Sequence, residues 1–205
     1  ANPGPREASV RAAMNGGVAK AAHASSLMCA LAVGAGQYGG SHEVYILMEL
    51  WKKIGISLED WKADLIKPAD KDTSDIWLPL EHAPGFDPNG VICPSIMLNI
   101  LDVLVEHSSK DSSLYWLKEN RCELEKHVGY PLALSGIAAA AFYDLGMDEH
   151  QASMLYLILR LPGAAAHALE QRNVNWKQFP FFANNIKLID DPGFKGIPTI
   201  EGLSL

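Results

Sequence analysis

Basic residues are scarce in this sequence, and they do not cluster as a nucleic-acid surface requires. The chain of 205 residues carries 17 Lys and Arg against 24 Asp and Glu, which gives a net charge of −7. Only Lys52 and Lys53 are adjacent. Nucleic-acid binding needs a basic stripe or patch, so the composition excludes this class of function. An anionic ligand would instead need a local arginine or a helix N-terminus.

Cysteine is also rare and is not arranged for metal binding or for a disulfide framework. The chain has three cysteines, Cys29, Cys93 and Cys122, without a CxxC spacing or a Cys/His pairing. This pattern is typical of isolated thiols in a reducing compartment. The sequence therefore predicts no metal site and no tightly bound cofactor.

The sequence is also not expected to contain a secretory signal or a membrane span. Residues 1–7 contain no apolar run of the kind that a secretory signal has. The run 21–33 is too short for a membrane span and is interrupted by His23, Ser25 and Ser26. We therefore expect a cytoplasmic protein that binds neither a membrane nor a nucleic acid.

No segment alternates apolar and polar residues as a half-buried strand does, so the predicted fold class is all-α. Glycine, proline and capping residues divide the chain into segments. We expect helices over 8–33 (with Gly16-Gly17 as a break or a close-packing point), 44–54, 57–66, from Pro94 onward, 111–127, 131–145, 148–160 and 164–172. The proline-rich stretch 67–93 predicts a long loop, and residues 173–205 predict a C-terminal arm.

One turn between two expected helices combines glycines with polar side chains. It reads Ala35-Gly36-Gln37-Tyr38-Gly39-Gly40-Ser41-His42-Glu43-Val44. Adjacent glycines allow the backbone to approach a ligand or another helix closely. Tyr38 and His42 could therefore converge on a site, and the alternative is an ordinary interhelical loop with two surface residues.

Three further segments follow this turn in a familiar order: Ala83-Pro84-Gly85-Phe86, then Leu134-Ser135-Gly136 with Tyr143-Asp144-Leu145-Gly146, and then the run 159–171 that begins Leu159-Arg160-Leu161-Pro162-Gly163. Together they resemble the citrate synthase superfamily, most closely its short citryl-CoA-lyase-like branch. The resemblance implies a single citrate synthase-like unit over 1–205, with a small lobe over about 56–130 and a truncated N-terminal part. It also implies a dimer that makes or breaks a carbon–carbon bond next to the carbonyl of an acyl-CoA thioester.

The residues that carry the chemistry in that family are replaced here. Tyr38 stands at the histidine of the family's P-L-H-G-G-A-N-E turn, and His42 stands at its asparagine. Ser135 falls on the aspartate of its N-V-D-G segment. Its G-F-G-H loop begins as Gly85-Phe86 but then loses the histidine. A serine hydroxyl is no general base without a base beside it, so the ordinary family mechanism is not expected.

The resemblance implies the following site residues: Tyr38, His42 and Ser135 as catalytic candidates, and Gly39, Gly40, Gly85, Phe86 and Arg160 as substrate-binding candidates. Arg160 matches the arginine that binds a substrate carboxylate, and the alternative for it is a structural salt bridge. His82 and His127 are expected to face solvent, and the pair His167 and Glu170 is expected to be structural.

Three functions remain open at this point. The first is an acyl-CoA lyase or synthase of altered chemistry, for which a coenzyme A thioester is the substrate. The second is a catalytically inactive homologue that binds a ligand or assists an active subunit, so the expected partner is a second copy or a related chain. The third is a thioester hydrolase that uses Ser135 as its nucleophile.

Overall fold

The computed structural model describes residues 7–65 and 82–174. In these ranges the chain forms α-helices and no β-strand, which confirms the all-α prediction. Residues 67–81 of the expected loop and 175–205 of the expected arm lie outside the described residues. The helices are α1 (Ala8–Val18), α2 (His23–Gly34), α3 (Ser41–Ile54), α4 (Leu58–Leu65), α5 (Ser95–Glu106), α6 (Ser113–Val128), α7 (Leu134–Asp144) and α8 (Glu149–Asn173).

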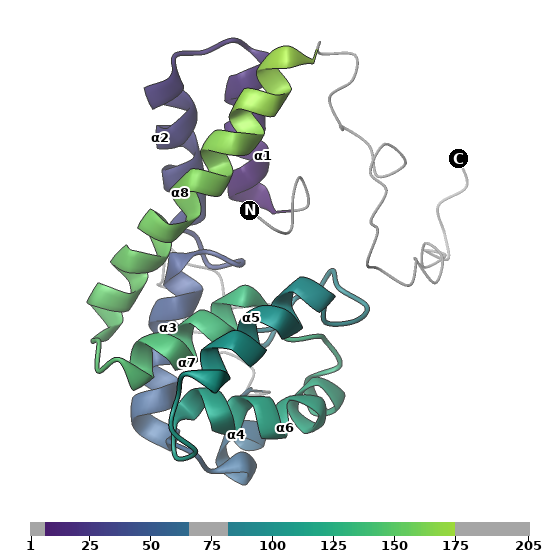
Figure 1. Cartoon of the computed structure of the whole chain (residues 1–205), viewed down its shortest axis with the longest axis vertical. Coiled ribbons are helices and arrows are strands. Elements are labelled where there is room, and N and C mark those ends of the chain that lie inside the picture. The colour runs from purple at the N-terminus through teal and green to yellow at the C-terminus, as the bar shows by residue number, and fades with distance from the viewer. Residues whose placement is uncertain (1–6, 66–81, 175–205) are drawn as a thin grey trace, which may run out of the picture.

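The long helix α8 connects two groups of helices (Figure 1). Its C-terminal half packs with α1 and α2, where the small residues Ala13, Ala30, Ala164 and Ala168 form one buried cluster. Its N-terminal half packs on α3 and α7, and these two helices share the main core with α4, α5 and α6. The expected small lobe, residues 56–130, thus supplies α4, α5 and α6 to this common core.

Helix α3 begins directly after the glycine turn and carries the centre of the main core. Val44, Leu47, Met48 and Trp51 recur at helical spacing and are all buried. The Trp51 ring meets the Trp61 ring edge to face, with 4.6 Å between the ring centroids. The turn that precedes α3 is therefore attached directly to the main core.

The glycine pair in the first helical segment is a close-packing point and not a break. A Cβ atom on Gly17 would lie 2.1 Å from the carbonyl oxygen of Ala168, so only glycine fits against α8 here. The chain instead reverses after α1, where Lys20 adopts a positive φ of 55°. The expected segment 8–33 is consequently two helices that pack against each other.

The predicted end of a helix at Arg160 is wrong, because α8 continues through Pro162 to Asn173. A proline inside a helix removes one hydrogen bond and costs about 3 kcal/mol. Here tertiary packing holds both halves in line, with Tyr156 buried on the N-terminal side and Ala164 and Ala168 buried on the C-terminal side. By length and composition α8 could also cross a membrane, but the same test is passed by core helices of soluble proteins.

Candidate functional site

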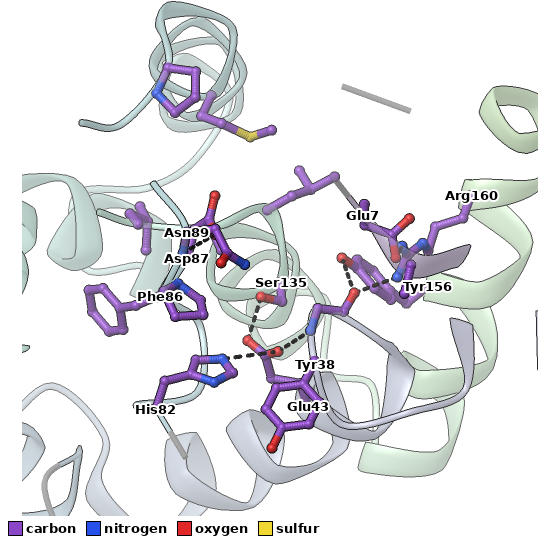
Figure 2. Close-up of a pocket in the computed structure, with 18 residues that line it drawn as sticks. Glu7, Tyr38, Glu43, His82, Phe86, Asp87, Asn89, Ser135, Tyr156 and Arg160 are labelled. Carbon is purple, nitrogen blue, oxygen red and sulfur yellow. Dashed lines mark hydrogen bonds and ion pairs between the residues drawn. The ribbon is translucent and has the colours of Figure 1, made fainter. Parts of the chain in front are cut away.

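A cavity of about 320 Å³ lies between the turn before α3, the loop before α5, the start of α7 and the middle of α8. Five residues that the sequence predicts as site residues line it: Tyr38, Gly39, Phe86, Ser135 and Arg160. Gly40, His42 and Gly85, which the sequence also predicts, are not among its lining residues. Figure 2 shows the Glu43 carboxylate between His82 and Ser135, with Glu7, Tyr156 and Arg160 on the α8 side.

Close backbone contact fixes the loop before α5 to the start of α7. The Ala133 N–H donates to the Gly85 carbonyl oxygen at 2.8 Å, and the Asp87 N–H donates to the Pro131 carbonyl oxygen at 2.8 Å. A Cβ atom on Gly136 would lie 2.7 Å from the Gly85 carbonyl oxygen. Glycine at both positions therefore allows the contact that brings Phe86 and Ser135 to one cavity, and Gly85 acts through its backbone.

Glu43 is the polar centre of the site, and its side chain is fully buried at 0% exposure. Its Oε1 accepts hydrogen bonds from the Gly85 N–H at 2.6 Å and from the Ser135 hydroxyl at 2.8 Å. Its Oε2 accepts a hydrogen bond from the Gly39 N–H at 2.6 Å. All three neighbours donate, which is the bonding pattern of a carboxylate. Glu43 thereby joins the turn, the loop and α7 into one unit.

His82 is buried, so the expectation that it faces solvent is wrong. Its ring stacks on the Tyr38 ring with 5.4 Å between centroids, and its Nε2 lies 3.9 Å from Glu43 Oε2. Its Nδ1 is buried and has no hydrogen-bond partner among the described residues. His127, in contrast, is exposed as expected and contacts the Lys62 carbonyl oxygen through Nε2 at 2.9 Å.

Tyr38 and His42 leave the turn in different directions. Tyr38 covers His82 and remains 49% exposed, and its hydroxyl points away from Glu43 and Ser135 (Figure 2). His42 is half-buried in the first turn of α3 and stacks on Tyr45 with 6.0 Å between centroids. His42 directly precedes Glu43, and consecutive residues of a helix point to different sides. His42 therefore does not line the cavity that Glu43 lines.

Ser135 is buried, and its hydroxyl hydrogen is directed to Glu43. The carboxylate lies between this serine and His82, so the order is serine, glutamate, histidine. A nucleophilic serine normally contacts the imidazole itself, with the acid on the far side of the ring. The geometry therefore does not favour a thioester hydrolase that uses Ser135.

Arg160 lines the cavity but already has a carboxylate partner within the chain. It forms an ion pair with Glu7, donates through Nη2 to the Ser9 hydroxyl at 2.8 Å and donates through Nη1 to the Gly39 carbonyl oxygen. Its guanidinium also lies 5.2 Å from the centroid of the Tyr156 ring. The structural salt bridge that the sequence allowed as the alternative role of Arg160 is thus present in the structure. It lies beside the cavity, where a substrate carboxylate would bind.

The environment changes the acidity of two groups around Arg160. Burial raises the pKa of Glu7, but the Arg160 charge and hydrogen bonds from Ser9 and Arg160 lower it more, so the net shift is downward. Burial is the main cause that raises the pKa of Tyr156, against a smaller lowering by Arg160. The Tyr156 hydroxyl therefore stays protonated and donates to the Gly39 carbonyl oxygen at 3.4 Å.

The two glycines of the turn serve the site through their backbone. Gly39 has a positive φ of 62°, which turns its N–H toward Glu43 and its carbonyl oxygen toward Arg160. A Cβ atom on Gly40 would lie 2.1 Å from the Gly36 carbonyl oxygen, so this residue permits the tight return of the chain. Among residues 7–65 and 82–174 there is no group of three or more side chains that could hold a metal ion.

Sequence reasoning missed Glu43 and His82 as members of the site. Glu43 had a usable signal, because it lies four residues before Leu47 and eight before Trp51, on the apolar face of α3. A glutamate on such a face needs buried partners. His82 had no comparable signal, because it lies in an irregular loop where no periodicity reports burial.

Comparisons with known proteins found no family model, no curated protein and no solved structure that matches this chain. The resemblance to the citrate synthase superfamily stays a prediction from the sequence. The geometry of the cavity is therefore the main basis for a functional proposal.

Proposed function

We propose that the chain acts on an acyl-CoA thioester or a related anionic substrate, and that it makes or breaks a carbon–carbon bond beside the carbonyl by a mechanism unlike that of citrate synthases. One observation carries the proposal. Tyr38, Phe86, Ser135 and Arg160 come from separate segments, which the resemblance selects as site segments, and they line a single cavity.

The cavity has the size and lining that suit the acyl end of such a substrate. At about 320 Å³ it lies at the lower end of the range for small-molecule sites, too small for a whole coenzyme A. Phe86, Met97 and Leu132 provide apolar walls. Arg160 lies at one side, where a substrate carboxylate that displaced Glu7 would meet its guanidinium.

A panel of acyl-CoA thioesters, with and without a carboxylate on the acyl group, tests the proposal on the wild-type protein. We expect binding of carboxylate-bearing thioesters by calorimetry and release of a shorter thioester by chromatography. Arg160→Ala should weaken binding by about tenfold to a hundredfold, the range for loss of a charged hydrogen bond. Arg160→Lys serves as the variant that retains the charge. Arg172→Ala serves as the control that removes an exposed arginine. Thermal unfolding of each variant shows whether it is folded.

Absence of both binding and turnover across the panel would contradict the proposal. Binding without turnover would identify the second candidate, a catalytically inactive homologue that acts as a binding or regulatory subunit. A specific observation favours this candidate: Arg160 already forms an ion pair with Glu7 and a hydrogen bond with Ser9 within the chain, so a ligand carboxylate would have to displace Glu7.

The proposed partner is a second copy of the chain or a related subunit. Apolar side chains on α2 and α8 are exposed in the single chain: Met28, Val33, Met154, Ile158, Leu159 and Leu169. Exposed apolar side chains that form a contiguous patch often mark a contact with another protein, and these six lie on two helices that pack together. Light scattering should give the mass of a dimer for the wild type and a lower mass for Ile158→Glu. A wild-type monomer would rule out the second copy and leave the related subunit as the proposed partner.

A further inference from the structure

We infer that His82 is the proton-transferring group of the cavity and that Glu43 is its positioning residue. The inference rests on the proposed function, because it names the group that moves the proton when the carbon–carbon bond forms or breaks. His82 is not one of the positions that the sequence singles out for chemistry. Only its place in the folded chain brings an imidazole to this cavity.

The first argument is the unsatisfied nitrogen of His82. The residue is more than nine-tenths buried, with 8% exposure, and its Nδ1 has no hydrogen-bond partner among residues 7–65 and 82–174. Buried polar atoms are nearly always bonded, and exceptions gather at sites where a ligand completes the bonding. Because His82 lines the cavity, a hydroxyl group of the substrate is the partner that fits Nδ1 once the Tyr38 ring has moved aside.

The second argument is the carboxylate on the other side of the ring. His82 Nε2 lies 3.9 Å from Glu43 Oε2, which is longer than a hydrogen bond. Catalytic hydrogen bonds are often long without substrate and shorten in the complex. Three donors prevent the Glu43 carboxylate from rotating away. The neutral ring therefore carries its hydrogen on Nε2, toward Glu43, and Nδ1 is the basic atom.

Acidic side chains predominate among the charged groups around the His82 ring. Glu43 faces His82 from α3, and Tyr38 faces it from the turn. Asp87 from the same loop and the Glu7–Arg160 pair also line the cavity, and the charges of this pair compensate each other. The charged groups around the imidazole are therefore acidic on balance. Tyr38 covers the ring and is half-exposed, so it is the side chain that would move to admit a substrate.

The step that follows suits a β-hydroxyacyl thioester. Nδ1 of His82 accepts the proton of the β-hydroxyl group, and the electron pair of the O–H bond forms the carbonyl of the leaving fragment. The carbon–carbon bond breaks, and its electron pair passes to the α-carbon as the enolate of the thioester. The imidazolium then returns the same proton to that carbon, so atoms, charge and electrons balance without a further reactant.

The first test compares the wild type with His82→Gln, Glu43→Gln and the exposed control His127→Gln on a β-hydroxyacyl-CoA. We expect His82→Gln to lower kcat by about 10²-fold to 10⁴-fold with little change in binding. His127→Gln should behave as the wild type. Glu43→Gln should also lower kcat, and its His82 ring should lose the preference for hydrogen on Nε2, because the amide no longer presents a carboxylate oxygen to the ring. Wild-type turnover by His82→Gln, or wild-type turnover and an unchanged tautomer in Glu43→Gln, would overturn the inference.

The second test needs no substrate, and it separates this inference from the proposed function. Side-chain ¹⁵N NMR of the wild type should show His82 as the tautomer with hydrogen on Nε2, with His82→Gln used to identify its signals. A hydrogen on Nδ1 would overturn the inference even if thioesters bind. If the Nε2 tautomer is found but no thioester binds, the role of His82 and Glu43 is supported and the proposed substrate class fails.

Discussion

Replacement of Glu43 by glutamine tests the central claim about the site, that one buried carboxylate holds three segments together. The change keeps the size of the side chain but replaces one acceptor oxygen with an amide NH₂ group. Gly39, Gly85 and Ser135 all direct donors at the carboxylate. Whichever way the amide turns, at least one of these donors then faces another donor.

The size of the effect follows from these contacts. An amide oxygen on the Oε1 side could still accept from the Gly85 N–H and the Ser135 hydroxyl, so the Gly39 N–H would lose its partner. An unsatisfied buried donor costs about 1–3 kcal/mol, and the two remaining bonds lose their charge assistance. Burial of a neutral amide avoids the desolvation of a charge and offsets part of this loss. We expect Glu43→Gln to lower the free energy of unfolding by about 2–4 kcal/mol.

Equilibrium unfolding in urea, followed by tryptophan fluorescence, measures this change, because Trp51 is buried on the same helix. Amide hydrogen exchange gives a second measurement that is specific to the site. The Gly39 N–H should lose protection first and the Gly85 N–H next, whereas amides in α6 should lose protection only in proportion to global stability.

The matched control is Glu123→Gln, which removes a carboxylate charge on the surface of α6. We expect it to leave the urea midpoint unchanged, because exposed ion pairs contribute little. If Glu43→Gln shifts stability by less than about 1 kcal/mol, or leaves exchange at Gly39 unchanged, then the carboxylate does not hold the turn and this reasoning is refuted.

Three further outcomes follow from particular contacts. Gly17→Ala should destabilise the protein by about 1–3 kcal/mol in the same urea assay, since the new Cβ would lie 2.1 Å from a carbonyl oxygen of α8. The pKa of Glu7 is lowered in the folded state from its ordinary value of 4.5. Its contribution to stability is therefore complete above pH 4.5 and is lost as the pH falls through the lower pKa of the folded state. The acid-unfolding curve of Glu7→Gln should show less of this loss. Burial, with a smaller contribution from Glu125, raises the pKa of Cys93 to about 11, so a thiol reagent at pH 8 should modify the two exposed cysteines and reach Cys93 only after denaturation.

Most helices could be predicted from the sequence because their signals are local. The spacing of Val44, Leu47 and Trp51 predicts the buried face of α3, and Gly55 ends this helix with a positive φ. Asp148 forms a capping box with Gln151 at the start of α8, as its place before a helical segment predicts. Such signals act within one or two helical turns, so no partner from elsewhere in the chain is needed to interpret them.

The sequence by itself thus determined an all-α protein, a glycine turn suited to close backbone contacts, and a set of segments that carry candidate site residues. Tertiary structure alone decided that α8 continues through Pro162, that Arg160 pairs with Glu7, and that His82, not His42, reaches the cavity. The physical reason is the range of the interactions. Helix periodicity and capping join residues a few positions apart, whereas the partners of buried charges such as Glu43 depend on which distant segments pack together.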